Sequence, residues 1–238
     1  MEERIFDRKL NQLGIVLTEE MKEQFDRYYE MLVEWNKVMN LTGITDYDEV
    51  NDKHFLDSLA IAKVQDMGKI STVIDIGTGA GFPGIPLKIV YPHLKVTLLD
   101  SLNKRIKFLN CVIQELSLEN ITALHGRAED YAKKAEYRES YDLCVSRAVA
   151  NLATLSEYCL PYVEKGGLFI SYKSGEIDEE LQRSEKAFPI LGGKVESVEK
   201  FCLPDSDIAR SFVKIRKERN TPGKFPRKAG LPAKEPLH

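Results

Sequence analysis

The sequence is poor in cysteine and has none of the spacings that cysteine chemistry needs. Its four cysteines, in 238 residues, include no C-x-x-C pair and no nearby pair of histidines. This pattern argues against a disulfide framework and against a zinc site. We therefore expect reduced thiols, no bound metal and a cytoplasmic location; the residues are Cys111, Cys144, Cys159 and Cys202.

Long hydrophobic runs are also missing. No apolar stretch approaches the roughly 18 residues that a membrane-spanning helix needs, and Met1-Glu2-Glu3-Arg4 does not open a signal peptide. There are no internal repeats, and 43% hydrophobic with 30% charged residues is ordinary for a globular protein. The length allows one large domain, or one domain with an extension, and we expect no membrane contact and a monomer.

The small net charge of −3 conceals an uneven distribution. Residues 1–50 carry 12 acidic and 6 basic side chains, whereas residues 212–238 carry 8 basic and 2 acidic ones. An acidic beginning and a basic end suggest a polyanion bound at one end of the molecule. A solvated, frayed terminus would give the same pattern, so charge alone leaves both interpretations open.

What the sequence does contain is one organising stretch, residues 73–100. The apolar run 73–76 has the length and β-branched content of a buried parallel strand. Gly77, Gly79 and Gly81 follow, and alternate glycines allow a sharp turn and a close approach to a ligand. A helix is predicted from Phe82, and a second apolar run, 96–99, ends in Asp100. This is a βαβ unit with a carboxylate about 20 residues past the glycines, placed to bind a ribose.

Two nucleoside ligands compete for this unit. Gly79, Gly81 and Gly84 form G-x-G-x-x-G, which would aim backbone amides at the pyrophosphate of NAD(P). Pro83 deletes one such amide, and Asp75 adds negative charge at the end of the strand. Both features disfavour a dianionic ligand and favour the ammonium and sulfonium of S-adenosylmethionine. The sequence therefore predicts the methyl donor over a dinucleotide; a glycine turn without any ligand is the remaining alternative.

The rest of the chain predicts a methyltransferase-like fold. Helical spacing marks residues 4–13, 18–39, 48–64, 101–116 and 150–160, and strands are expected at 121–125, 141–146, 168–172, 194–202 and 211–215, the last two as a hairpin after a turn at 161–167. The fold class is α/β: a seven-stranded Rossmann-like sheet, mostly parallel, with a C-terminal antiparallel hairpin and an N-terminal helical extension. We expect an extension over residues 1–66, a catalytic domain over 67–219 and a basic, Pro-rich, loosely ordered tail over 220–238.

Further binding residues are expected where strands end. Ala128 and Glu129 follow the third strand, where a small side chain and a carboxylate could accommodate adenine, although an ordinary capped turn would look alike. Arg147 ends the fourth strand and could hold a carboxylate or phosphate. Lys173 ends the fifth strand with the same argument in weaker form. His54 lies within a predicted helix, where a packed or surface histidine is the commoner outcome.

Two missing features reduce the range of possible methyl acceptors. The chain has Ser146-Arg147-Ala148-Val149 where enzymes that methylate exocyclic amines of bases have [N/D]-P-P-[F/Y], and Cys144 lies inside an apolar strand, unsuited to be a nucleophile. A ring nitrogen such as guanine N7 remains, because no proton must be removed before its attack. No general base is then expected, and only Lys173 and His54 stand as catalytic candidates. The rival functions are an NAD(P)-binding oxidoreductase, a small-molecule methyltransferase and a ligand-free ribosome-binding protein.

A family resemblance is carried by segments spread over nearly the whole chain: Trp35-Asn36 with Asn40-Leu41-Thr42, Lys53-His54-Phe55-Leu56-Asp57-Ser58-Leu59, Asp75-Ile76-Gly77-Thr78-Gly79-Ala80-Gly81-Phe82-Pro83-Gly84, Asp100-Ser101 with Lys104-Arg105, Gly126-Arg127-Ala128-Glu129, Ser146-Arg147-Ala148, and Thr221-Pro222 with Pro226-Arg227-Lys228. Together they resemble the RsmG (GidB) family. The resemblance implies a bacterial 16S rRNA guanine-N7 methyltransferase that uses S-adenosylmethionine and acts on 16S rRNA or the small ribosomal subunit. It implies donor contacts by Gly77, Phe82, Ala128, Glu129 and Arg147.

Two further expectations come from spacing and charge and do not depend on the family resemblance. Asp100 and Gly79 are assigned to the donor site from their spacing. The basic tail is expected to grip RNA, because guanine N7 lies in the deep groove of A-form RNA and the target must be unstacked or in a loop. Removal of residues 220–238 should then weaken RNA binding and flatten its salt dependence while leaving donor binding intact.

Overall fold

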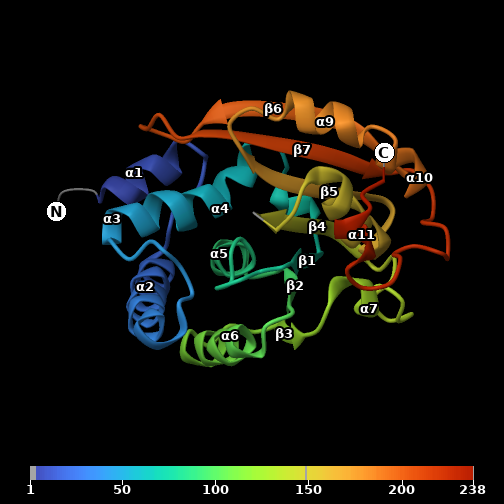
Figure 1. Cartoon of the computed structure of the whole chain (residues 1–238). Coiled ribbons are helices and arrows are strands. Elements are labelled where there is room, and N and C mark those ends of the chain that lie inside the picture. The colour runs from blue at the N-terminus through green and yellow to red at the C-terminus, as the bar shows by residue number, and fades with distance from the viewer. Residues whose placement is uncertain (1–3, 148, 238) are drawn as a thin grey trace.

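A single seven-stranded sheet forms the centre of the molecule (Figure 1). The computed structural model describes residues 4–147 and 149–237, so Ala148 of the Ser146-Arg147-Ala148 motif and the first three residues lie outside the described residues. The strand order is β3-β2-β1-β4-β5-β7-β6; β1 to β5 are parallel and β7 is antiparallel to both neighbours. This confirms the predicted fold class. The strands are β1 (Thr72–Ile76), β2 (Lys95–Asp100), β3 (Ile121–His125), β4 (Tyr141–Arg147), β5 (Val163–Ser174), β6 (Gly193–Cys202) and β7 (Ala209–Lys217).

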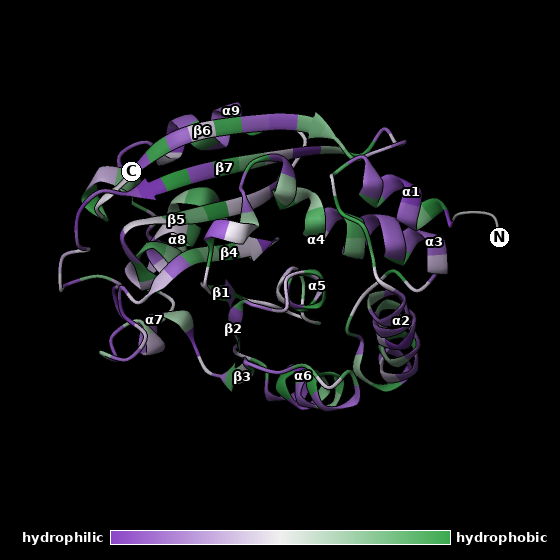
Figure 2. Ribbon diagram, turned by 180° about the vertical axis from the view of Figure 1, so that it is seen from behind, coloured by the Kyte–Doolittle hydropathy of each residue, from purple (hydrophilic) through white to green (hydrophobic). Residues whose placement is uncertain are grey.

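The central strands are apolar on both faces because helices cover both. Along β1, Val73 packs into one core and its neighbour Ile74 into the other; along β5, Ile170 and Phe169 divide in the same way. The period of two in a strand thus builds two separate cores. Hydrophilic and hydrophobic residues alternate along β6 and β7 at the edge of the sheet (Figure 2).

One core lies under the helices of the N-terminal half: α1 (Ile5–Asn11), α2 (Glu19–Met39), α4 (Asp57–Leu59), α5 (Gly84–Val90) and α6 (Asn103–Glu115). The other lies under α7 (Ala128–Tyr131), α8 (Leu152–Cys159), α9 (Asp178–Ser184), α10 (Ala187–Ile190) and α11 (Leu231–Lys234). In the part of the chain that the structure describes, no helix has the length and apolarity needed to cross a membrane.

The predicted helix at residues 48–64 is helical as far as Lys63 but is not one regular α-helix. It consists of α3 (Tyr47–Val50), a π-helical turn (Asn51–Leu56), α4 and a 3₁₀ turn (Ala60–Lys63). A π-turn closes its hydrogen bond over one more residue than an α-helical turn, and such turns are frequent at functional sites. Here the π-turn contains His54, which it brings beside the glycine loop.

The fifth strand is longer than predicted, because the expected turn at Gly166-Gly167 is a bulge within the strand. Gly166 has a φ of +91°, and the pairing register with β4 shifts between Tyr141 and Leu143. A Cβ on Gly167 would lie 2.8 Å from the Asp142 carbonyl oxygen, so the two backbones approach more closely than a side chain permits. Glycines at a bulge give the same sequence signal as glycines at a turn.

The C-terminal tail is not loosely ordered. Thr221, Phe225 and Pro232 are buried, and α11 packs on α8 (Figure 1). The basic, Pro-rich composition misled the prediction, because the buried positions are few and widely spaced. The tail crosses the second core and returns to the carboxyl ends of the parallel strands.

Candidate cofactor site

The candidate site lies where the strand order reverses, between β1 and β4. In open parallel sheets a crevice forms at such a point, outside the carboxyl ends of the strands. Gly77 follows β1, Asp100 ends β2, Gly126 follows β3 and Arg147 ends β4. Residues that lie far apart in the sequence therefore meet at the carboxyl ends of the parallel strands.

The glycine loop after β1 needs its glycines for backbone conformation. Gly77, Gly79 and Gly81 have φ values of +70°, +64° and +103°, which side chains adopt only at a cost. A Cβ on Gly79 would meet no atom within 4 Å, so this glycine also leaves the backbone open to the cavity. On its other side, the loop is held by α2, whose buried Tyr28 hydroxyl donates to the Ala80 carbonyl.

The start of α5 has no amide to offer to a pyrophosphate. The Phe82 N–H donates to the Thr78 carbonyl and the Ile85 N–H to the Gly81 carbonyl. The Gly84 N–H donates to the Asp75 carboxylate at 2.9 Å. A dinucleotide of the G-x-G-x-x-G type needs such groups free. The structure thus agrees with the preference against a dinucleotide but gives a broader reason than the single amide missing at Pro83.

Asp75 has a different role from the one that the sequence suggested. It is fully buried, accepts from the Thr78 hydroxyl at 2.7 Å and from the Gly84 amide, and leaves its other oxygen without a partner. Burial raises the pKa of its carboxyl to about 7, against the hydrogen bonds from Thr78 and Gly84. Asp75 therefore fixes the loop from its buried side, and its carboxyl is not fully charged at neutral pH.

Asp100 lies beside the glycine loop and accepts three hydrogen bonds. One oxygen accepts from the Leu102 amide at 2.9 Å, and the other accepts from the Gly79 amide at 3.0 Å and from Arg105 at 3.1 Å. It borders two adjoining cavities that also share Gly77. A carboxylate oxygen can accept more than one hydrogen bond, so Asp100 can hold the loop and still accept from a hydroxyl group.

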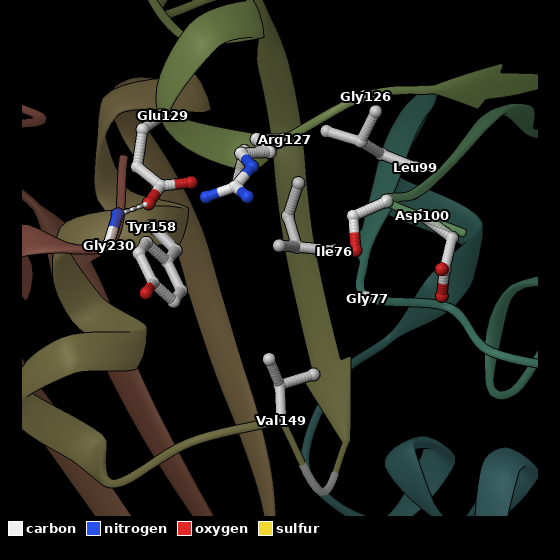
Figure 3. A pocket seen from close by; sticks show the side chains of 12 residues that line it. Ile76, Gly77, Leu99, Asp100, Gly126, Arg127, Glu129, Val149, Tyr158 and Gly230 are labelled. Carbon is white, nitrogen blue, oxygen red and sulfur yellow. Dashed lines mark hydrogen bonds between the residues drawn. The ribbon is translucent and has the colours of Figure 1, made fainter. Parts of the chain in front are cut away.

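The first cavity, of about 320 Å³, is shown in Figure 3. Leu99 and Ala128 give it apolar walls, and Glu129 and Tyr158 stand on the side opposite Asp100. Glu129 is almost fully buried, and one of its oxygens accepts from the Gly230 amide at 2.9 Å. An apolar slot with a carboxylate at each end suits a flat heterocycle joined to a ribose.

The second cavity, of about 370 Å³, continues past Asp100 and the glycine loop to Phe82. The His54 ring stacks on Phe82 with centroids 4.6 Å apart, and the Arg147 guanidinium lies 5.1 Å from the same ring. Thr42 and Arg105 complete this side. A cation on an aromatic face, next to a polar loop, makes this the polar half of the cleft.

His54 lies in the cleft as a neutral imidazole at neutral pH. Burial, together with the neighbouring Arg147, lowers the pKa of His54 from its ordinary 6.5 to about 4. Its Nε2 lies 2.8 Å from the Thr42 hydroxyl. Cys144 is fully buried inside β4, and burial raises the pKa of its thiol, as expected for a packed residue.

A third cavity, of about 480 Å³, adjoins the second one at His54 and Arg147. Asp57, almost fully buried, bridges two guanidinium groups here: Arg147 at 2.9 Å and Arg210 at 2.7 Å. Lys173 lines this cavity and not the first two, and its ammonium donates to Glu180 at 2.7 Å and to the Ala150 carbonyl at 2.8 Å.

The structure brings the predicted residues into one cleft, with Lys173 at its far end. Sequence reasoning missed the residues that reach the cleft from other elements, because single side chains in unremarkable segments carry no local signal. Arg105, Arg127 and Asp57 lay within the quoted motifs but were given no role; the others are Tyr158, Arg210 and Gly230. Among the described residues there is no group of three or more His, Cys, Asp or Glu that could hold a metal.

Comparisons with solved structures agree with this fold. The chain is similar to crystal structures of M. jannaschii TYW2 in complex with AdoMet (TM-score 0.51, 15% identity, 63% of this chain and 70% of that chain) and of a mutant of MtNAS (TM-score 0.54, 16% identity, 84% and 76%). At these identities the likeness concerns the fold. The structural likeness supports the methyltransferase-like sheet.

Sequence relatives are much closer. The chain is 55% identical over 232 residues to ribosomal RNA small subunit methyltransferase G of Lachnoclostridium phytofermentans, covering 98% of this chain and 96% of the relative. It is 53% identical to the protein of the same name from Brevibacillus brevis, covering 94% of each. The family model described as rRNA small subunit methyltransferase G matches residues 21–209. The chain therefore belongs to the rRNA small subunit methyltransferase G (GidB) family.

Proposed function

We propose that this protein transfers the methyl group of S-adenosylmethionine to N7 of a guanine in the RNA of the small ribosomal subunit. The observation that carries the proposal is the cleft at the switch point, whose two adjoining cavities meet at Asp100 and Gly77 and open into a third at Arg147. Membership of the family supports the substrate class. The site residues below are proposals from their positions.

The cleft fits the donor in three parts. Ala128 and Glu129 would bind adenine in the first cavity, Asp100 would accept from the ribose hydroxyls, and the loop from Gly77 to Phe82 would hold the methionine part. The open space beside the Gly79 backbone would let the methionine part approach the loop closely. When bound, S-adenosylmethionine would supply a methyl group carried on its sulfonium. The carbon–sulfur bond breaks as the acceptor nitrogen bonds to the methyl carbon, and its electron pair stays on the sulfur, which becomes a neutral thioether.

The third cavity is the proposed seat of the acceptor base. It lies directly beyond Phe82 and Arg147, so a base placed there faces the methionine end of the donor cleft. Lys53, Lys173 and Arg210 line or border it, which suits a nucleotide with its phosphate. Orientation is the main contribution expected of these side chains, because a ring nitrogen with a free lone pair needs no base.

Neutral His54 fits this view. An imidazole with a pKa near 4 carries no charge at neutral pH and would not repel the sulfonium. Its ring, packed parallel to Phe82, narrows the passage between the donor and acceptor cavities. We propose that His54 and Phe82 exclude water and align the base, and that Arg147 holds both by its contacts with Asp57 and the Phe82 ring.

The test is transfer of a radiolabelled methyl group to small-subunit RNA made by transcription and to assembled subunits lacking the modification. We expect label in RNA and none in RNA whose guanines are replaced by 7-deazaguanine, which has no N7 lone pair. Label retained in the 7-deazaguanine RNA would overturn the N7 assignment. Binding of NAD but not of S-adenosylmethionine in calorimetry would overturn the function itself.

A further inference from the structure

The C-terminal segment, residues 220–237, is fixed to the body of the protein at three points. At its start, the Thr221 amide donates to Glu139 at 2.6 Å, and Arg138 donates to the Thr221 and Phe225 carbonyls at 2.7 and 3.0 Å. The Phe225 side chain is buried in the second core. A frayed terminus would have none of these buried contacts.

The second and third points flank a short stretch of the segment. Arg227 makes a two-pronged ion pair with the fully buried Glu157 of α8, with distances of 2.9 and 2.6 Å. Further on, the buried Thr154 hydroxyl of α8 donates to the Pro232 carbonyl at 2.9 Å. Paired charges of this kind hold a definite geometry, because an unpaired buried carboxylate is costly.

Gly230 lies between these two points and reaches the first cavity. Its amide donates to Glu129 at 2.9 Å, while the second oxygen of Glu129 points away from Gly230 (Figure 3). Gly230 has a φ of +82°, a conformation that a glycine adopts without strain. The segment thus supplies a wall of the cavity and a hydrogen bond that fixes one oxygen of Glu129.

We propose that the C-terminal segment is part of the methyl-donor site, and that the Gly230 amide is a positioning group that orients Glu129 toward the amino edge of adenine. This rests on the proposed function. It departs from the sequence-based expectation that the segment serves RNA alone. Donor affinity measured without RNA should therefore depend on the segment.

The experiment compares two glycines of the same segment in the full chain. Gly230→Val forces a β-branched side chain into a left-handed backbone conformation, whereas Gly223→Val places the same side chain at an exposed position with ordinary φ. A Cβ at either position would meet no atom within 4 Å. We expect Gly230→Val to weaken S-adenosylmethionine binding in calorimetry about five-fold, the worth of one hydrogen bond. Gly223→Val should stay within about two-fold of the unsubstituted chain.

A double-mutant cycle separates positioning from simple blockage of the cavity. With Glu129→Ala as background, Gly230→Val should have little further effect, because the group that Gly230 orients is gone. A loss that persists in this background would mean that the valine fills the cavity, and would overturn the proposal.

Thr154→Val gives a second route, since it loosens the segment from α8 without touching the cavity. We expect a smaller loss of donor affinity that also vanishes with Glu129→Ala. Equal donor affinity in all variants would overturn the proposal while leaving the proposed function intact. Absence of donor binding by the unsubstituted chain would instead overturn the proposed function.

Discussion

At the scale of single residues, Asp75 couples the glycine loop to pH. Its folded-state pKa of about 7 lies above the ordinary 3.8, so the folded state favours the protonated carboxyl. The stability that this contributes is fully present below about pH 4 and is lost as the pH rises through 7. The cause is desolvation of a carboxylate that has an unpartnered oxygen.

Asp75→Asn should remove this pH dependence. We expect the free energy of unfolding of the unsubstituted chain, relative to the variant, to fall between pH 4 and pH 8 by on the order of 4 kcal/mol at most. The depressed pKa of His54 acts in the opposite direction but cancels in this difference. Urea unfolding of both proteins across this range measures the effect; two parallel stability curves would contradict it.

Asp57 provides a second prediction at the same scale. It bridges Arg147 and Arg210 while almost fully buried, so Asp57→Asn removes the negative charge that pairs with both guanidinium groups. We expect a loss of about 3 kcal/mol in the free energy of unfolding. Glu176→Gln, which breaks an exposed pair with Lys200, should cost less than about 1 kcal/mol. Similar losses in chemical denaturation of the two variants would refute the view that the bridge is a buried one.

At the scale of elements, the N-terminal helices support the glycine loop. Tyr28 of α2 stacks near Phe55 and Phe82 and reaches the loop through its hydroxyl. The loop has few side chains of its own, so its conformation depends on what packs against it. The N-terminal extension thus contributes to the site through packing as well as through His54.

Tyr28→Phe removes only the hydroxyl that donates to Ala80. We expect about 1 kcal/mol less stability and faster amide exchange at Gly81 and Phe82, because the loop loses one of its fixed points. Tyr29→Phe is the matched control, since its hydroxyl binds the exposed Thr45 carbonyl. Hydrogen exchange that changes equally in both variants, or in neither, would contradict a supporting role for α2.

Elements also show which features a sequence can reveal. The glycine loop, the strand ends and the hairpin follow from local composition and from the periods of strand and helix, so they were predicted within a few residues. The bulge in β5 was not, because Gly166-Gly167 is equally compatible with a turn. The contact between Glu129 and Gly230 joins residues 101 positions apart, and no local pattern signals it.

At the scale of the whole molecule, the basic C-terminal end carries less free charge than its composition suggests. Lys217 is buried and donates to the Leu160 carbonyl and Thr221, and Arg227 is taken up by Glu157. Lys224, Lys228 and Lys234 remain exposed on the C-terminal segment. The same segment therefore presents lysines to solvent and a backbone amide to Glu129 in the first cavity.

The exposed lysines should account for the RNA contacts of the segment. Replacing Lys224, Lys228 and Lys234 by alanine should lower the slope of log affinity against log salt by about 2, since each lost phosphate contact removes roughly 0.7–0.9. Donor affinity should not change, because Gly230 and its anchors are untouched. The control replaces Lys69, Lys95 and Lys165 by alanine. These lysines are exposed near the amino ends of β1, β2 and β5, so the control removes the same charge at the opposite ends of the strands. An equal drop in slope for both triple variants, measured by filter binding to small-subunit RNA, would mean that net charge and not this segment grips the RNA.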